Sequence, residues 1–146
     1  MNTKMIALSL SLAAVACQSS GTASKASDDS RAQQFVKTNV VTIPEVAAFV
    51  RRHDATIVDA NGTDTRHEMG VVPGALLLSD SHNYPLSELP AVKSSKLVFY
   101  CGGEMCRASD AAAARAAQAG YTDVNVMRAG IRGWKSAGNP TQLPRS

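Results

Sequence analysis

The chain has 146 residues, which is enough for one domain with its own hydrophobic core but not comfortably for two. With 45% hydrophobic and 18% charged residues, the composition excludes wholesale disorder as well as a membrane-spanning bundle. The net charge of +3 comes without any cluster of lysine and arginine, so we do not expect the protein to bind nucleic acid.

Residues 1–16 have the pattern of an export signal. A short positive segment ending at Lys4 precedes the apolar run MIALSLSLAAVA, which is too short to span a bilayer as a helix. The small residues before Cys17 resemble the lipobox of bacterial lipoproteins, in which the cysteine is acylated and becomes the new N-terminus, although leucine is usual where this chain has Ala14. We therefore expect an exported lipoprotein, anchored through Cys17 to a bacterial membrane and facing the periplasm, and Gln18 favours the outer membrane. A plain secretory signal, which would leave Cys17 as an odd thiol, is the alternative.

Residues 17–35 are expected to form a flexible tether. The segment QSSGTASKASDDSRAQQ after Cys17 is rich in Ser, Ala and Gly and has no apolar periodicity, so it cannot bury enough surface to fold. It would join the anchor to a globular domain over residues 36–146, or form an exposed tail if no anchor exists.

From residue 36 onward, strand-like and helix-like segments alternate. Short apolar, β-branched runs predict strands at 56–59, 76–78, 96–100 and 123–127. Helices are predicted after Thr42, after Ser109 and from Gly130, and Asn61-Gly62 is typical of a turn. This alternation predicts an α/β domain with a mainly parallel sheet, in which ligands bind at the carboxyl ends of the strands.

Cys101 follows directly on the predicted strand KLVFY, so it lies where a site is expected. Two glycines after it permit unusual backbone angles, and the N–H groups of five loop residues can then curl around a common centre: Gly102, Gly103, Glu104, Met105 and Cys106. The N-terminus of a helix near Ser109 and the charge of Arg107 also favour an anion. We therefore expect the thiol of Cys101 to have a lowered pKa and to act as a nucleophile, with a buried structural thiol as the alternative.

The other loop residues have more than one interpretation. Cys106 could resolve a persulfide or a sulfenate on Cys101 through a reversible disulfide, or form a permanent 101–106 disulfide, or pack as a small apolar residue. Arg107 is expected to bind the substrate anion, with pairing to Glu104 or Asp110 as the alternative.

No group of residues has the spacing of a metal site, so we expect neither a metal nor a cofactor. The three histidines, His53, His67 and His82, are interpreted as solvated loop residues.

Three motifs between about residues 41 and 141 resemble the rhodanese family. The first is IVDANGTDTRHEMGVVPGALLL, with Asp59 after a strand and then Gly-x-x-Pro-Gly-Ala. The second is Tyr100-Cys101, a loop, and a helix that begins Ser109-x-x-Ala-Ala; the third is GYTDVNVMRAGIRGW. The resemblance implies a three-layer α/β fold with a parallel sheet of about five strands and helices on both faces. It implies transfer of sulfane sulfur, for example from thiosulfate to a thiol or cyanide, through a persulfide on Cys101, with Asp59 and Ser109 in supporting roles.

The loop also departs from the family pattern. Five residues separate Cys101 from Arg107 where four are usual, and Val71 and Asn61 stand where a histidine and an arginine are usual. A loop of this length is also found in rhodanese-fold phosphatases and arsenate reductases, which have a histidine where this chain has Tyr100.

These departures leave three alternatives to sulfur transfer. They are a thiol redox module that uses a Cys101/Cys106 disulfide, a non-catalytic rhodanese-like binding domain and, less favoured, an arsenate reductase or phosphatase. The expected partner is a small sulfur-containing anion or thiol. The sequence identifies neither a particular sulfur donor or acceptor nor a protein partner.

Overall fold

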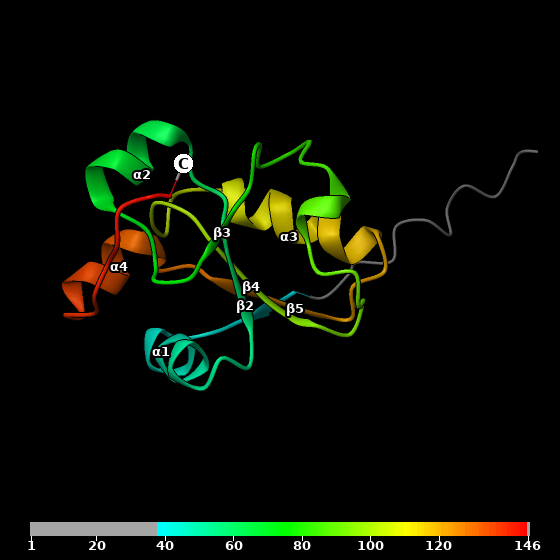
Figure 1. The fold of residues 1–146 in the computed structure, drawn as a ribbon, viewed down its shortest axis with the longest axis horizontal. Coiled ribbons are helices and arrows are strands. Elements are labelled where there is room, and N and C mark those ends of the chain that lie inside the picture. The colour runs from blue at the N-terminus through cyan, green and yellow to red at the C-terminus, as the bar shows by residue number, and fades with distance from the viewer. Residues whose placement is uncertain (1–37, 146) are drawn as a thin grey trace, which may run out of the picture. The chain divides into compact units, whose positions relative to one another are not determined.

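The computed structural model describes residues 38–145, which contain a single parallel sheet with helices packed against it (Figure 1). The strands are β1 (Asn39–Val40), β2 (Thr56–Asp59), β3 (Leu76–Leu77), β4 (Lys96–Tyr100) and β5 (Asp123–Met127). Their order in the sheet is β1-β5-β4-β2-β3, and every pairing is parallel. The predicted α/β class with a parallel sheet of about five strands is therefore confirmed.

Four helices and one short 3-10 helix connect these strands. They are α1 (Ile43–Arg52), α2 (Thr63–Met69), η2 (Leu86–Glu88), α3 (Ala108–Gln118) and α4 (Gly130–Ser136). The helix predicted after Thr42 begins there, and the Thr42 N–H donates a hydrogen bond of 2.7 Å to the Glu45 carboxylate. In the part of the chain that the structure describes, no helix is both long and apolar enough to cross a membrane.

Side chains of the central strand alternate between the two faces of the sheet. Leu97 and Phe99 of β4 pack in the core cluster that contains the buried alanines of α3. Val98 and Tyr100 point the other way, into the cluster that contains Trp134 of α4 and residues of α1. Because successive strand residues face opposite sides, β4 contributes to both cores, and helices cover both faces of the sheet (Figure 1).

Besides the short 3-10 helix η2, two elements were not predicted from the sequence. Helix α2 buries none of its residues, so it has no apolar periodicity, and the segment that holds His67 was wrongly interpreted as a loop. Strand β1 is only two residues long and lies at the edge of the sheet, with both residues exposed. Both elements depend on contacts with the rest of the domain and not on a local pattern.

The predicted signal segment (1–16), Cys17 and the tether (17–35) lie outside the described residues. They stay predictions.

Candidate active site

The loop after β4 lies at the carboxyl end of the sheet, beside the segment that follows β2. Asp59 and Tyr100 are register partners, and the N–H of Ala60 donates a 2.9 Å hydrogen bond to the Tyr100 carbonyl. The pairing therefore brings Asn61 close to Cys101 and the loop after it. Cys101 occupies the strand end, as predicted.

Cys101 is enclosed beneath this loop. The residue is only 1% exposed, and its Sγ lies 3.2 Å from the Ser109 hydroxyl. The thiol also donates a hydrogen bond of 3.4 Å to the carbonyl oxygen of Cys106. Both cysteines of the loop are free thiols in this structure.

The start of α4 supports the loop from the side. The N–H groups of Ile131 and Arg132 donate to the carbonyls of Cys101 and Gly102, at 2.8 and 3.2 Å. Gly130 has a φ of +60°, and a Cβ there would overlap the Cys101 oxygen and lie 2.5 Å from the Gly103 nitrogen. A glycine is thus required for α4 to approach the loop backbone this closely.

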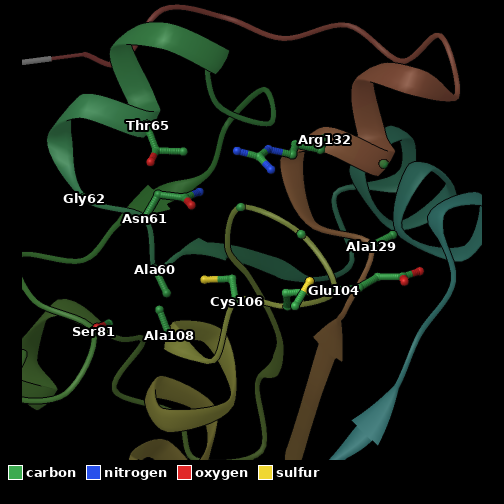
Figure 2. A pocket seen from close by; sticks show the side chains of 14 residues that line it. Ala60, Asn61, Gly62, Thr65, Ser81, Glu104, Cys106, Ala108, Ala129 and Arg132 are labelled. Atoms are coloured by element: carbon green, nitrogen blue, oxygen red, sulfur yellow. The ribbon is translucent and has the colours of Figure 1, made fainter.

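A pocket of about 670 Å³ opens next to the loop (Figure 2). Its walls come from the loop, from the segment after β2 and from the start of α4, and they include Asn61, Thr65, Gly102, Gly103, Glu104, Met105, Cys106 and Arg132. Five of the predicted loop residues therefore line the pocket. Of the two loop thiols, the partly buried Cys106 lines it and Cys101 does not. A pocket of this size suits a small-molecule ligand.

The two thiols differ in their electrostatic surroundings. Burial raises the pKa of Cys101, and its hydrogen bond to Cys106 raises it further, while contacts with Ser109 act in the opposite direction. For Cys106, partial burial acts to raise the pKa, but hydrogen bonds from the Cys101 thiol and from the N–H groups of Ala108 and Gly102 lower it overall. The prediction of a lowered pKa at Cys101 is therefore wrong, because burial has the largest effect on this thiol and raises its pKa.

Arg107 does not reach the pocket. Its side chain is 76% exposed and pairs with Asp110 at 3.1 Å, so the prediction that it binds the substrate anion is corrected to the surface pairing considered as the alternative. The cation in the pocket wall is Arg132, whose guanidinium extends from α4 toward Asn61 and Thr65 (Figure 2). Glu104 also lines the pocket, but its exposed carboxylate points away from Cys106 (Figure 2).

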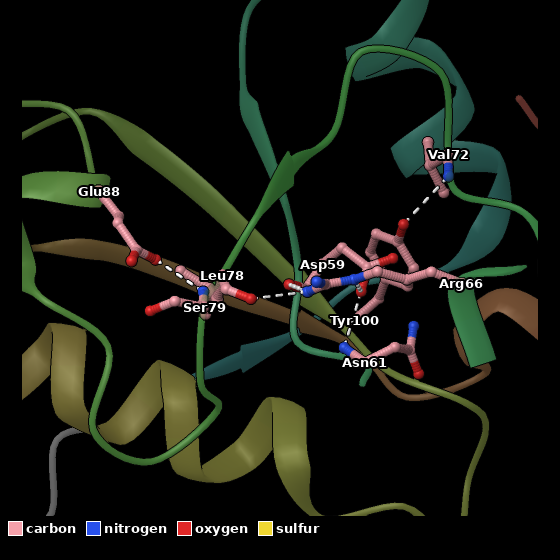
Figure 3. A network of polar contacts seen from close by, with 8 residues as sticks. All are labelled: Asp59, Asn61, Arg66, Val72, Leu78, Ser79, Glu88 and Tyr100. Carbon is pink, nitrogen blue, oxygen red and sulfur yellow. Dashed lines mark hydrogen bonds and ion pairs between the residues drawn. The ribbon is translucent and has the colours of Figure 1, made fainter. Parts of the chain in front are cut away.

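A buried ion pair lies under the segment after β2 (Figure 3). Asp59 Oδ1 accepts hydrogen bonds from the Asn61 N–H at 2.7 Å and from Arg66 Nε at 3.1 Å. Arg66 also donates to the carbonyls of Asp59 and Leu78, at 3.0 and 2.9 Å, which ties α2 to two strand ends. Asp59 thus holds the loops beside the site together, and its cationic partner comes from α2.

The Asn61 side chain has an unused hydrogen-bond donor. The residue is 8% exposed and lines the pocket, and its Nδ2 is one of two buried side-chain polar atoms without a partner among the described residues, the other being Asp59 Oδ2. A buried amide without a partner is costly, so a ligand that accepts a hydrogen bond would be favoured here.

Sequence reasoning missed the contribution of Arg132 and Thr65 to this pocket. The signal for Arg132 was its place just after a predicted strand, because the carboxyl ends of neighbouring parallel strands meet at one edge of the sheet. Thr65 lies in the helix that was not predicted. Within residues 38–145, no group of three or more His, Cys, Asp or Glu side chains is arranged to hold a metal ion.

The chain belongs to the rhodanese family. A rhodanese-like domain is matched over residues 42–137, which is more than half of the chain and includes the site described above. A search of curated proteins found no match.

Solved structures show the same fold at low sequence identity. The rhodanese-like domain of an Anabaena protein is 20% identical with a TM-score of 0.57, and the match covers 74% of this chain and 81% of that one. A human single-domain sulfurtransferase is 19% identical with a TM-score of 0.55, with 68% and 97% covered. A protein of unknown function from Rhodopseudomonas palustris, described as a possible tyrosine phosphatase, is 22% identical with a TM-score of 0.60, with 72% and 85% covered.

Proposed function

We propose that this protein is a rhodanese-type sulfurtransferase that moves sulfane sulfur from a small anion, such as thiosulfate, to a thiol or cyanide. The sulfur would be carried as a persulfide in the loop after β4, where family resemblance points to Cys101. The observation that carries the proposal is the placement of two free thiols, Cys101 and Cys106, in one loop beside the pocket at the carboxyl end of the sheet. The fold shared with a human sulfurtransferase is consistent with this function.

The pocket has groups that suit a sulfur oxyanion. Arg132 supplies a positive charge, and Asn61 Nδ2 supplies a donor that has no partner within the protein. Charged hydrogen bonds of this kind favour an anionic substrate with acceptor oxygens. A volume of about 670 Å³ leaves room for a larger acceptor beside such an anion.

The test is thiosulfate:cyanide sulfurtransferase activity of the purified full-length protein. We expect the wild type to form thiocyanate, and a double variant with Cys101→Ser and Cys106→Ser to form none. Arg107→Gln is the matched control, because it alters the same loop without touching a pocket-lining side chain. A wild-type protein without activity, or a double variant that keeps it, would refute the proposal.

A thiol redox module is the second candidate, favoured by the placement of two free thiols in one loop, where the Cys101 thiol donates a 3.4 Å hydrogen bond to the Cys106 carbonyl oxygen. Alkylation followed by mass spectrometry separates it from the first. A persulfide after exposure to thiosulfate supports sulfur transfer, whereas a stable 101–106 disulfide that does not react with thiosulfate supports the redox function. A non-catalytic binding domain would show neither product.

Phosphatase or arsenate reductase chemistry ranks below these candidates. The longer loop favours it, but Arg107 pairs with Asp110 outside the pocket, and Tyr100 replaces the histidine usual before the cysteine.

We also propose that the protein is exported and lipid-anchored through Cys17, with the outer membrane favoured by Gln18. The positive segment, the apolar run and the small residues before Cys17 support this. Intact-mass measurement of the native protein tests it: a chain that begins at an acylated Cys17 is expected, and an uncleaved or unacylated chain would refute the anchor.

A further inference from the structure

We propose that Cys106 is the first acceptor of sulfane sulfur in this site and that Cys101 resolves the persulfide formed there. This rests on the sulfurtransferase function proposed above, and it assigns the two thiols successive roles. The Cys106 side chain faces the pocket, and Cys101 lies behind it against the start of α3.

Access to the pocket separates the two thiols. Cys106 is partly exposed and forms part of the pocket wall, whereas Cys101 is 1% exposed and enclosed by the Ser109 hydroxyl and the Cys106 carbonyl. In Figure 2 the Cys106 sulfur lies between the Ala60 and Ala108 sides of the pocket and the loop. An anion that enters the pocket therefore meets Cys106 first.

The loop backbone also stabilises a thiolate at Cys106. Hydrogen bonding from the Cys101 thiol and from the backbone of Ala108 and Gly102 lowers the pKa of Cys106, and Ala108 opens the eleven-residue helix α3. Donors at a helix N-terminus favour negative charge, and the thiolate is the attacking form of cysteine. Burial raises the pKa of Cys101, and its thiol donates a hydrogen bond to the Cys106 carbonyl oxygen.

Two pocket groups are placed to hold the other end of the donor. Asn61 is 8% exposed and lines the same pocket, and its Nδ2 has no hydrogen-bond partner among the described residues. Arg132 supplies the positive charge. Together they suit the three oxygens of a sulfonate while its outer sulfur faces Cys106. The donor class is therefore a sulfane-sulfur anion with a sulfonate end, such as thiosulfate.

Sulfur transfer from thiosulfate proceeds in two steps. The Cys106 thiolate attacks the outer sulfur of thiosulfate, the new sulfur–sulfur bond forms, the bond within thiosulfate breaks, and sulfite leaves with the electron pair. Cys101 then gives its proton to the outer sulfur, and its thiolate attacks the Sγ of Cys106, which forms the 101–106 disulfide and releases the outer sulfur as hydrosulfide. The two thiols are oxidised by two electrons and the sulfane sulfur is reduced by two. A dithiol reductant supplies the electrons that restore the pair, and an acceptor such as cyanide competes by taking the outer sulfur from Cys106 directly.

The experiment uses the full-length, pre-reduced protein, thiosulfate as the probe, and single variants. Sulfite, hydrosulfide and thiocyanate are quantified, and alkylated peptides are mapped by mass spectrometry, with the Cys17 peptide read separately. We expect the wild type to release sulfite and hydrosulfide in equal amounts, up to one of each per chain, and to form the 101–106 disulfide. Cys101→Ser, which keeps a hydroxyl donor beside Cys106, is expected to release sulfite but no hydrosulfide, to accumulate a persulfide on Cys106, and to keep thiocyanate formation.

Cys106→Ser is expected to lose sulfite release and thiocyanate formation. A Cys106→Ser protein that forms a persulfide on Cys101 at the wild-type rate would overturn the assignment while leaving sulfur transfer intact. If no protein releases sulfite, the sulfurtransferase function itself fails. Mapping of the wild-type peptides after brief exposure to thiosulfate needs no variant, and a persulfide found on Cys101 alone would also overturn the assignment.

Discussion

Replacing Gly130 with alanine tests whether α4 holds the active loop in place. Gly130 has a φ of +60°, and its Cα faces the loop backbone at Cys101, Gly102 and Gly103. A methyl group at this position would lie 2.5 Å from the Gly103 nitrogen and 2.8 Å from the Gly102 carbonyl carbon, well inside ordinary contact. Because all three neighbours are backbone atoms, the loop itself has to move.

The size of the effect follows from two separate costs. A left-handed conformation costs an alanine roughly 1 kcal/mol. Forcing a methyl group into a closely packed site costs about 1–3 kcal/mol more, because the backbone must shift. We therefore expect Gly130→Ala to lower the free energy of unfolding by about 2–4 kcal/mol. Because the loop carries both thiols, a displacement on the order of 1 Å is also expected to lower sulfur-transfer activity by about 10²-fold.

Gly138→Ala is the matched control for this experiment. Gly138 has a φ of +78°, but nothing lies within 4 Å of a Cβ built on it. We expect a loss of only about 1 kcal/mol and unchanged activity. Urea unfolding followed by the fluorescence of Trp134, the single tryptophan, gives the free energy of unfolding of each variant. The thiosulfate:cyanide assay gives the activity of each variant. Equal losses for the two variants, or full activity in Gly130→Ala, would refute the claim that α4 supports the loop through this contact.

Three further predictions concern the ion pair, a buried tyrosine and the pocket cation. Arg66→Met is expected to lower the free energy of unfolding by about 3–5 kcal/mol in urea, because it leaves the buried carboxylate of Asp59 without its cation. Burial raises the pKa of Tyr84 to about 12, so stability is expected to be constant below the unfolded-state value of about 10 and to fall as the pH rises from there to 12. Unfolding measured across this range should give a shallower fall for Tyr84→Phe. Arg132→Gln is expected to raise the KM for thiosulfate by about tenfold with kcat less affected, whereas Arg107→Gln leaves both unchanged.

Each of these has a comparison that could contradict it. Arg52→Met removes a pair whose side chains are 57% and 41% exposed, so it should cost less than about 1 kcal/mol, and an Arg66→Met protein no less stable than this would contradict the first prediction. An identical pH dependence in wild type and Tyr84→Phe would contradict the second. If Arg107→Gln changed KM as much as Arg132→Gln, the assignment of the pocket cation would be wrong.

Local patterns in the sequence were sufficient for the central strands and for the position of the loop. β4 is an apolar run after Lys96, and in β5 the apolar residues alternate with Asp123 and Asn125. Polar or glycine-containing segments bound both, so their strand character and the placement of Cys101 at a strand end could be predicted. The alanine-rich stretch that became α3 and the capping residues of α1 were equally readable. These features depend on residues within a few positions of each other along the chain.

The tertiary structure decided the features that join distant segments. α2 has no buried residue, and hydrogen bonds from Arg66 to Asp59 and Leu78 hold it against the sheet. Its sequence therefore has no apolar periodicity from which a helix could be predicted. The choice of Arg132 over Arg107 as the pocket cation arises because β4 and β5 are neighbours, which sets the start of α4 against the loop.

The same holds for the two thiols of the loop. Their order along the chain shows that they are close, but it does not show which one is enclosed. That depends on how the loop backbone turns: the Cys106 N–H bonds to the Gly103 carbonyl, which leaves Cys106 at the pocket wall and Cys101 beneath it. Loop residues without a repeating pattern have their side-chain directions set by these backbone bonds and by the helices packed around them, and such contacts exist only in the folded chain.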